Sequence, residues 1–257
     1  MSLFILHPDA TMIDMLRSGA LVFLAIGQAA AAYWPDIRGR EHTITSRSAA
    51  LDTPVVPFGP FFAIWVLIFL SCLGFALWSA LPANLGDNYF RDVGWIVSAL
   101  FAGNVVWEMW VPRRGLDWIS VAIILVELGL ALWLLFVSAS AGLSGWDYWL
   151  GAAPLQLFAG WVSVATFVNL SSTMLRPYVG QSGPKLGNPR TTPVAVMVLI
   201  ASSAVGIALT VLTGSAPYAF AVVWALVGIA VANRERRNLF VLSGAAAIMT
   251  VAVGVTA

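Results

Sequence analysis

Long runs of apolar residues, separated by short polar stretches, dominate the whole chain. Eight of these runs are long enough, or nearly so, to cross a bilayer, which takes roughly 20 mostly apolar residues in a helix. They cover residues 14–34, 58–81, 93–112, 117–139, 147–174, 192–213, 217–233 and 238–256. Because backbone amides inside lipid must be satisfied within their own segment, the runs predict helices rather than strands. We therefore expect an all-α polytopic membrane protein with eight transmembrane helices.

Composition supports this class and excludes a soluble domain. Of the 257 residues, 60% are hydrophobic and only 10% are charged, and the mean hydropathy is +0.88. Soluble domains carry about a quarter charged residues, so this chain could not build a water-soluble surface. We expect the lipid bilayer as its surroundings, and the net charge of +1 gives no reason to expect a nucleic-acid partner.

The basic residues predict an orientation. With eight spans, the loops between helices one and two, three and four, five and six, and seven and eight share one face, which holds 11 of the 13 basic residues. The other face holds only Arg17 and Arg91. By the positive-inside rule, the arginine-rich loops are cytoplasmic and both termini lie outside. We expect a multi-pass protein of a bacterial-type inner (plasma) membrane.

Two connections are longer than a turn, at residues 35–57 and 175–191. Loops of this length are often lids or binding elements, although a plain solvated connector fits each of them equally well. The second loop divides the chain into a five-helix bundle, residues 1–175, and a three-helix C-terminal extension, residues 176–257.

Aromatic residues form a ridge on the second predicted helix. Phe61, Trp65 and Phe69 recur at i, i+4 and i+8, so their rings share one helical face, with Cys72 beside them. Such a ridge is typical of core packing and also fits the wall of a binding pocket.

Polar residues share a face of the third predicted helix. Asn104, Trp107 and Glu108 stand at i, i+3 and i+4, near its predicted cytoplasmic end. Because Arg113 and Arg114 follow closely, a salt bridge from Glu108 at the membrane interface is the simplest interpretation.

Glu127 differs, because it stands in the middle of the apolar run ISVAIILVELGLALWLLF. A carboxylate at that depth must face the bundle interior and find a partner or a proton. A ligand or proton contact and a structural hydrogen bond between helices are both open interpretations.

The fifth predicted helix carries a mixed stripe. Phe158, Trp161, Ala165 and Asn169 fall at i, i+3, i+7 and i+11, with small residues between them. Small residues let a neighbouring helix approach closely. This face is expected to pack against helices two and three or to line a cavity between them.

Three stretches resemble the tryptophan-rich sensory protein (TspO/MBR, translocator protein) family. They are PFGPFFAIWVLIFLSCLGFALW, similar to the family's second helix; LFAGNVVWEMW, similar to its third-helix L-x-x-N-x-x-W element; and GWVSVATFVN, similar to its fifth-helix W-V-S-x-A-x-x-x-N element. The resemblance covers about residues 14–175. It implies a five-helix bundle with a ligand cavity below the loop between helices one and two.

Family members bind tetrapyrroles and, in some cases, sterols or drug-like molecules, so the resemblance implies a planar apolar ligand, for example of the porphyrin or haem type, and no certain cofactor. Motif positions and the polar or aromatic residues near them give the candidate ligand-binding set: Trp65, Phe69, Asn104, Trp107, Glu127, Phe158, Trp161, Ala165 and Asn169. No metal site is expected, and His42, which stands in a predicted loop, is an improbable axial ligand.

The chain departs from the family pattern in two places. Pro154 stands seven residues before Trp161, where the family normally has a proline at four, a place held here by Leu157. Residues 176–257 have no counterpart in the short family members, so the identity of the ligand does not follow from the resemblance.

Four functions are compatible with the sequence. Aromatic walls with a few polar groups suit a sensor or regulator that binds a planar apolar molecule. A transporter of such lipophiles and an accessory subunit of a larger membrane complex are alternatives, and a homodimer is also conceivable. An enzyme is not expected, because no nucleophile–base pair, metal cluster or phosphate loop is visible in the sequence.

Overall fold

The computed structural model describes residues 6–37, 53–176 and 191–256. Within these ranges the elements are α1 (Met12–Ile37), the 3₁₀ turn η1 (Gly59–Ala63), α3 (Ile64–Ser79), α4 (Asn88–Arg114), α5 (Trp118–Ser140), α6 (Gly145–Asp147), the π-helical turn η2 (Tyr148–Ala152), α7 (Ala153–Leu175), α8 (Thr191–Thr213), α9 (Ala216–Ala232) and α10 (Arg237–Thr256). Seven helical stretches are long and apolar enough to cross a membrane, and α9 is a shorter apolar helix. The chain is thus an all-helical, multi-pass membrane protein, and the eight predicted helices are confirmed.

Polar caps set several helix starts that hydropathy alone could not place. Asp87 caps α4, and therefore this helix begins five residues before the predicted apolar run at 93. Asp117 and Ser120 form a reciprocal capping box at the start of α5, and Ser215 caps α9. Each cap satisfies an N–H group that the first helical turn leaves without a partner.

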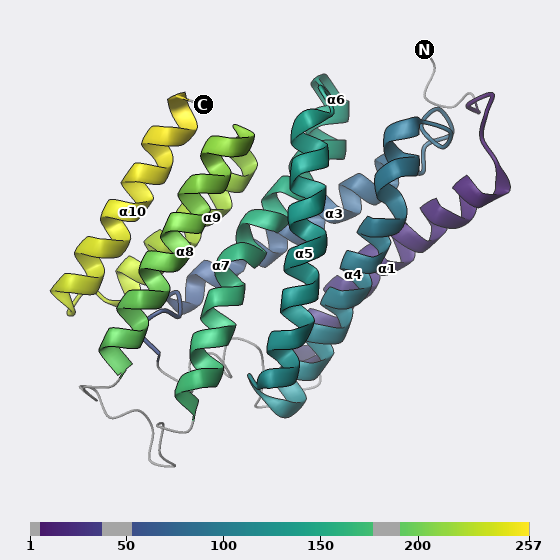
Figure 1. Cartoon of the computed structure of the whole chain (residues 1–257). Coiled ribbons are helices and arrows are strands. Elements are labelled where there is room, and N and C mark those ends of the chain that lie inside the picture. The colour runs from purple at the N-terminus through teal and green to yellow at the C-terminus, as the bar shows by residue number, and fades with distance from the viewer. Residues whose placement is uncertain (1–5, 38–52, 177–190, 257) are drawn as a thin grey trace.

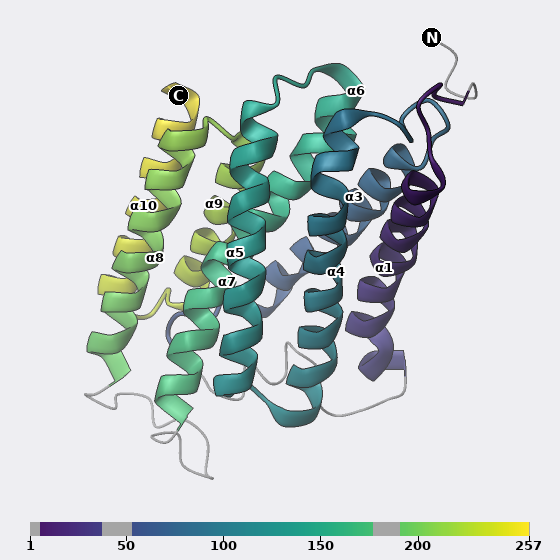
Figure 2. The same ribbon diagram turned by 45° about the vertical axis from the view of Figure 1, so that its right-hand side comes forward.

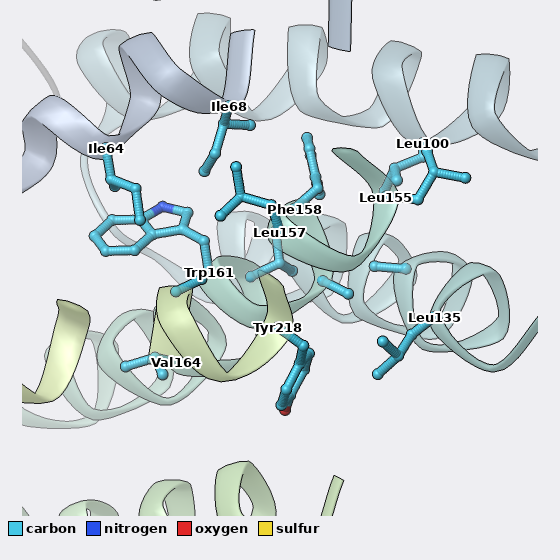
Figure 3. Packing of buried hydrophobic residues seen from close by; sticks show 14 of the residues in the cluster. Ile64, Ile68, Leu100, Leu135, Leu155, Leu157, Phe158, Trp161, Val164 and Tyr218 are labelled. Carbon is cyan, nitrogen blue, oxygen red and sulfur yellow. The ribbon is translucent and has the colours of Figure 1, made fainter. Parts of the chain in front are cut away.

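Helix α7 lies at the centre of the molecule (Figures 1 and 2). It packs against α5, α9, α8 and α3. In its most apolar window 89% of the residues are buried, against 28–50% in the other six spans. Figure 3 shows part of this core, with Trp161 of α7 beside Ile64 of α3. The predicted single inward stripe is therefore too narrow a description, because neighbouring helices cover α7 on nearly every side.

The crossing of α7 and α9 is very close. A Cβ atom at Gly160 would lie 2.5 Å from the carbonyl oxygen of Tyr218, so only glycine permits this approach. Two hydrogen bonds flank it: the Tyr218 hydroxyl donates to Ser163 Oγ at 3.2 Å, and Ser215 Oγ donates to Gln156 Oε1 at 2.8 Å. The C-terminal helices thus dock directly on α7, while the division of the chain into domains at residue 175 stays a prediction.

The start of α1 and the end of α10 lie at the same end of the bundle (Figures 1 and 2). There the buried guanidinium of Arg17 pairs with Asp14 at 2.6 Å and donates to the Leu85 carbonyl oxygen at 2.8 Å. Arg91 of α4 pairs with the same carboxylate at 2.8 Å. Arg91 therefore fastens α1 to α4, and Arg17 fastens α1 to the turn that precedes α4.

Candidate functional site

A small cavity lies where α3, α4 and α7 meet, and we call it the aromatic cavity. Its volume is about 30 Å³, and its described lining residues are Pro57, Phe62, Trp65, Trp107, Leu116, Trp161, Val164, Ala165, Val168 and Asn169. Five of the nine candidate residues are among them: Trp65, Trp107, Trp161, Ala165 and Asn169. Helices two, three and five of the sequence-based prediction thus meet at one place.

Edge-to-face aromatic pairs build the wall of the cavity. The Trp161 ring lies 6.0 Å from Trp65 at 79° and 6.0 Å from Phe62 at 82°. Phe69 stacks on the outer side of Trp65, with centroids 5.2 Å apart at 21°. Phe158 contacts Trp65 edge-on at 6.3 Å. Pairs of this geometry stabilise a fixed arrangement, so Phe69 and Phe158 support the wall without lining the cavity.

Three N–H donors around the cavity have no acceptor. The indole Nε1 atoms of Trp107 and Trp161 and the Nδ2 atom of Asn169 are all buried without a hydrogen-bond partner. The Asn169 Oδ1 atom lies 3.0 Å from Ser120 Oγ and accepts from Thr173 Oγ1 at 3.4 Å, which places the Nδ2 atom on the other side of the amide. Buried indole N–H groups normally find a partner. The site therefore offers donors to an acceptor atom that the protein itself does not supply.

The other polar candidates lie elsewhere. Asn104 is buried between α4 and α1, where its Nδ2 donates to Gln28 Oε1 at 3.0 Å. Glu127 of α5 is buried against α4, since a Cβ atom at Gly103 would lie 3.1 Å from its Cγ atom. Neither residue lines the aromatic cavity. Sequence spacing placed both inside the bundle, but it could not tell which helix interface each would occupy.

Glu108 does not form the expected salt bridge. Its side chain is buried, and neither carboxylate oxygen has a hydrogen-bond partner. Arg113 donates to the Met109 carbonyl oxygen of its own helix, and Arg114 lies over the Trp110 ring. The prediction is therefore wrong: both arginines point to nearer partners at the exposed end of α4, while Glu108 faces the interior between helices.

Helix α9 holds a segment next to the aromatic cavity through contacts that the sequence did not reveal. Trp224 Nε1 donates to the Phe61 carbonyl oxygen at 2.7 Å, and Phe58 N donates to the Gly228 carbonyl oxygen at 2.9 Å. Asn233 Nδ2 reaches the Pro54 carbonyl oxygen at 2.6 Å. These contacts fix residues 54–61 on α9. Since Pro57 and Phe62 line the cavity, the C-terminal part of the chain shapes the candidate site.

Most of the two predicted long loops, residues 35–57 and 175–191, lies outside the described residues, and so does His42. Among the described residues that line the aromatic cavity, none is a histidine, cysteine or methionine.

A family model described as TSPO-like protein matches residues 17–257. The chain belongs to the TSPO-like family. The match runs through residues 176–257, so the three C-terminal helices are part of the pattern of this family and not only of this chain. No curated protein and no solved structure matches the chain significantly. Membership of the TSPO-like family agrees with the membrane-embedded, aromatic-rich bundle described above.

Proposed function

We propose that this TSPO-like protein binds a planar apolar small molecule, such as a tetrapyrrole or a lipid, in the aromatic cavity and acts as a sensor or regulator. One observation carries the proposal: three buried N–H donors without acceptors surround an otherwise apolar, aromatic wall. Each such donor left without a partner costs about 1–3 kcal/mol. A ligand carboxylate or carbonyl oxygen would recover part of that cost, while its ring packs on Trp65 and Trp161.

The size of the cavity sets a condition on this proposal. At about 30 Å³ it has room for a water molecule or two, whereas drug-sized ligands occupy roughly 300–1,000 Å³. Binding must therefore separate Trp65 and Phe62 from Trp161. Because a site that has to open associates slowly, we expect an association rate below about 10⁵ M⁻¹s⁻¹.

The experiment that tests the proposed acceptor role compares two porphyrins on protein in nanodiscs. Protoporphyrin carries two carboxylates, whereas etioporphyrin has the same ring and none. Asn169→Leu is expected to weaken protoporphyrin binding about tenfold, because a hydrogen bond to a charged acceptor is worth about 1.5–3 kcal/mol. It should change etioporphyrin binding little. Equal effects on both porphyrins would contradict a donor role for Asn169.

Transport of such lipophiles is the second candidate. Two helices of the site begin with irregular turns, η1 before α3 and η2 before α7. Transporters often build their binding sites from interrupted helices, and π-helical turns frequently occur at functional sites. Porphyrin flux into liposomes that contain the protein would support transport. Saturable binding without flux would favour the sensor.

For localisation, we propose a plasma membrane with the arginine-rich loops on the cytoplasmic side. The protein has one cysteine, Cys72, which is fully buried and so gives little labelling background. Two separate variants, Arg234→Cys and Ser144→Cys, would each add one exposed thiol, at opposite ends of the bundle. In intact cells an impermeant maleimide should label Ser144→Cys and spare Arg234→Cys. The reverse pattern would invert the proposed orientation.

A further inference from the structure

A second hollow, which we call the amine groove, lies between α1 and α4. Its volume is about 270 Å³, and its described lining residues are Gly27, Ala30, Ala31, Trp34, Val105, Glu108, Met109, Pro112 and Arg113. It shares none of these residues with the aromatic cavity. The α1 side consists mainly of small residues, which leave room for a ligand between the two helices.

Glu108 gives the groove one strong chemical feature. Its side chain is 1% exposed, and both carboxylate oxygens lack a hydrogen-bond donor. A carboxylate removed from water without a partner costs several kcal/mol. Glu108 lines the hollow, but its carboxylate oxygens are buried, so a molecule in the groove reaches them only when the Glu108 side chain turns toward it.

None of the charged side chains described near Glu108 donates a hydrogen bond to its carboxylate. Arg113 lines the same groove, but it is exposed and donates to the Met109 carbonyl oxygen. Across α4, Glu127 of α5 adds a second buried acid, whose Oε1 atom also lacks a partner. The residues that α1 contributes to the groove carry no charge. The buried region therefore has an excess of acid over base.

The groove has one carboxylate and an otherwise mostly apolar lining, which fits an organic ammonium better than a metal ion. A hard metal ion takes about six to eight oxygen ligands, and the side chains of the groove offer a single carboxylate. A primary ammonium group brings up to three N–H donors, which match two carboxylate oxygens in a charge-assisted hydrogen bond. An alkyl chain attached to that ammonium would lie against Gly27, Ala30 and Ala31. We propose that the amine groove binds a lipophilic primary amine, with its ammonium group on Glu108.

The test uses octylamine as the probe and octanol as its uncharged analogue, with native mass spectrometry to count bound molecules. Octylamine is expected to bind at a single saturable site and octanol at least about tenfold more weakly, as the loss of a charge-assisted hydrogen bond requires. Glu108→Gln should weaken octylamine binding by a similar factor. Glu127→Gln is the matched control, because it removes a buried carboxylate that does not line the groove, and it should weaken octylamine binding less than Glu108→Gln does.

A second variant keeps the test decisive if Glu108→Gln unfolds. Ala31→Leu leaves the carboxylate in place and narrows the groove, so it should also weaken octylamine binding at least about tenfold while the melting temperature of the protein stays within a few degrees. Equal binding of octanol and octylamine, or undiminished octylamine binding in Glu108→Gln or in Ala31→Leu, would overturn the proposal. Porphyrin binding is measured separately, because the two hollows share no residue.

Discussion

The close crossing of α7 and α9 makes Gly160→Ala the most informative stability test. The added Cβ atom would meet the Tyr218 carbonyl oxygen at 2.5 Å and the Ala221 Cβ atom at 2.9 Å, whereas ordinary contacts begin at 3.4 Å. The first neighbour is backbone, so α9 as a whole must move away by nearly 1 Å. Overpacking of this kind costs about 1–3 kcal/mol, and the better helix propensity of alanine returns about 0.5–1 kcal/mol. We expect a net loss of up to about 2.5 kcal/mol.

The assay is unfolding of the purified protein in mild detergent, followed by circular dichroism as SDS is added. Gly129→Ala is the control, because Gly129 is an exposed residue of α5 and a Cβ atom added there would meet no other atom within 4 Å. It should be neutral or stabilise the protein by about 0.5–1 kcal/mol. If Gly160→Ala unfolds at the same SDS fraction as Gly129→Ala, the close α7–α9 contact does not exist as described.

Three other single contacts can be tested by substitution. Asp14→Asn leaves the buried Arg17 without its ion partner, so the free energy of unfolding should fall by about 3–5 kcal/mol. The thermal unfolding midpoint should fall accordingly, and an unchanged midpoint would refute the pairing. Trp224→Phe replaces the indole with a smaller ring and removes the hydrogen bond to the Phe61 carbonyl oxygen, so stability should fall by at least about 0.5–1.5 kcal/mol. Porphyrin should then associate faster in stopped-flow, and slower association would contradict the inference that α9 holds residues 54–61 in place. Ala165→Leu overfills the aromatic cavity and should weaken porphyrin binding at least about tenfold. Retained affinity would show that the ligand binds elsewhere.

Helical spacing and the family motifs together predicted half of the residues that line the aromatic cavity. Trp161, Ala165 and Asn169 share one face of α7, and Trp65 and Trp107 come from the two other helices whose motifs resemble the family. Periodicity fixes which residues of one helix lie together, and apolar length fixes that the helices cross the membrane. Both kinds of information are local in sequence.

Contacts between distant segments could not be predicted in this way. Asn104 is assigned to the site as a motif position and Glu127 as a carboxylate deep in an apolar run. Which interface each occupies depends on how α4 and α5 are rotated against their neighbours. The hold of α9 on residues 54–61 joins segments more than 160 residues apart. Every residue has a carbonyl oxygen, so the sequence cannot show which one accepts a hydrogen bond. The bond from Trp224 to the Phe61 carbonyl oxygen could therefore be found only in the structure.

Ligand binding in the aromatic cavity is tested most directly by titrating protoporphyrin into the protein in nanodiscs and following tryptophan quenching. We predict saturable binding at one site and a loss of at least about tenfold in Trp161→Leu, because that ring forms the wall shared by Trp65 and Phe62. Trp133→Leu is the matched control, since Trp133 is 45% exposed on α5 and lies outside the cavity. Binding that never saturates, or that falls equally in both variants, would contradict ligand binding in the aromatic cavity.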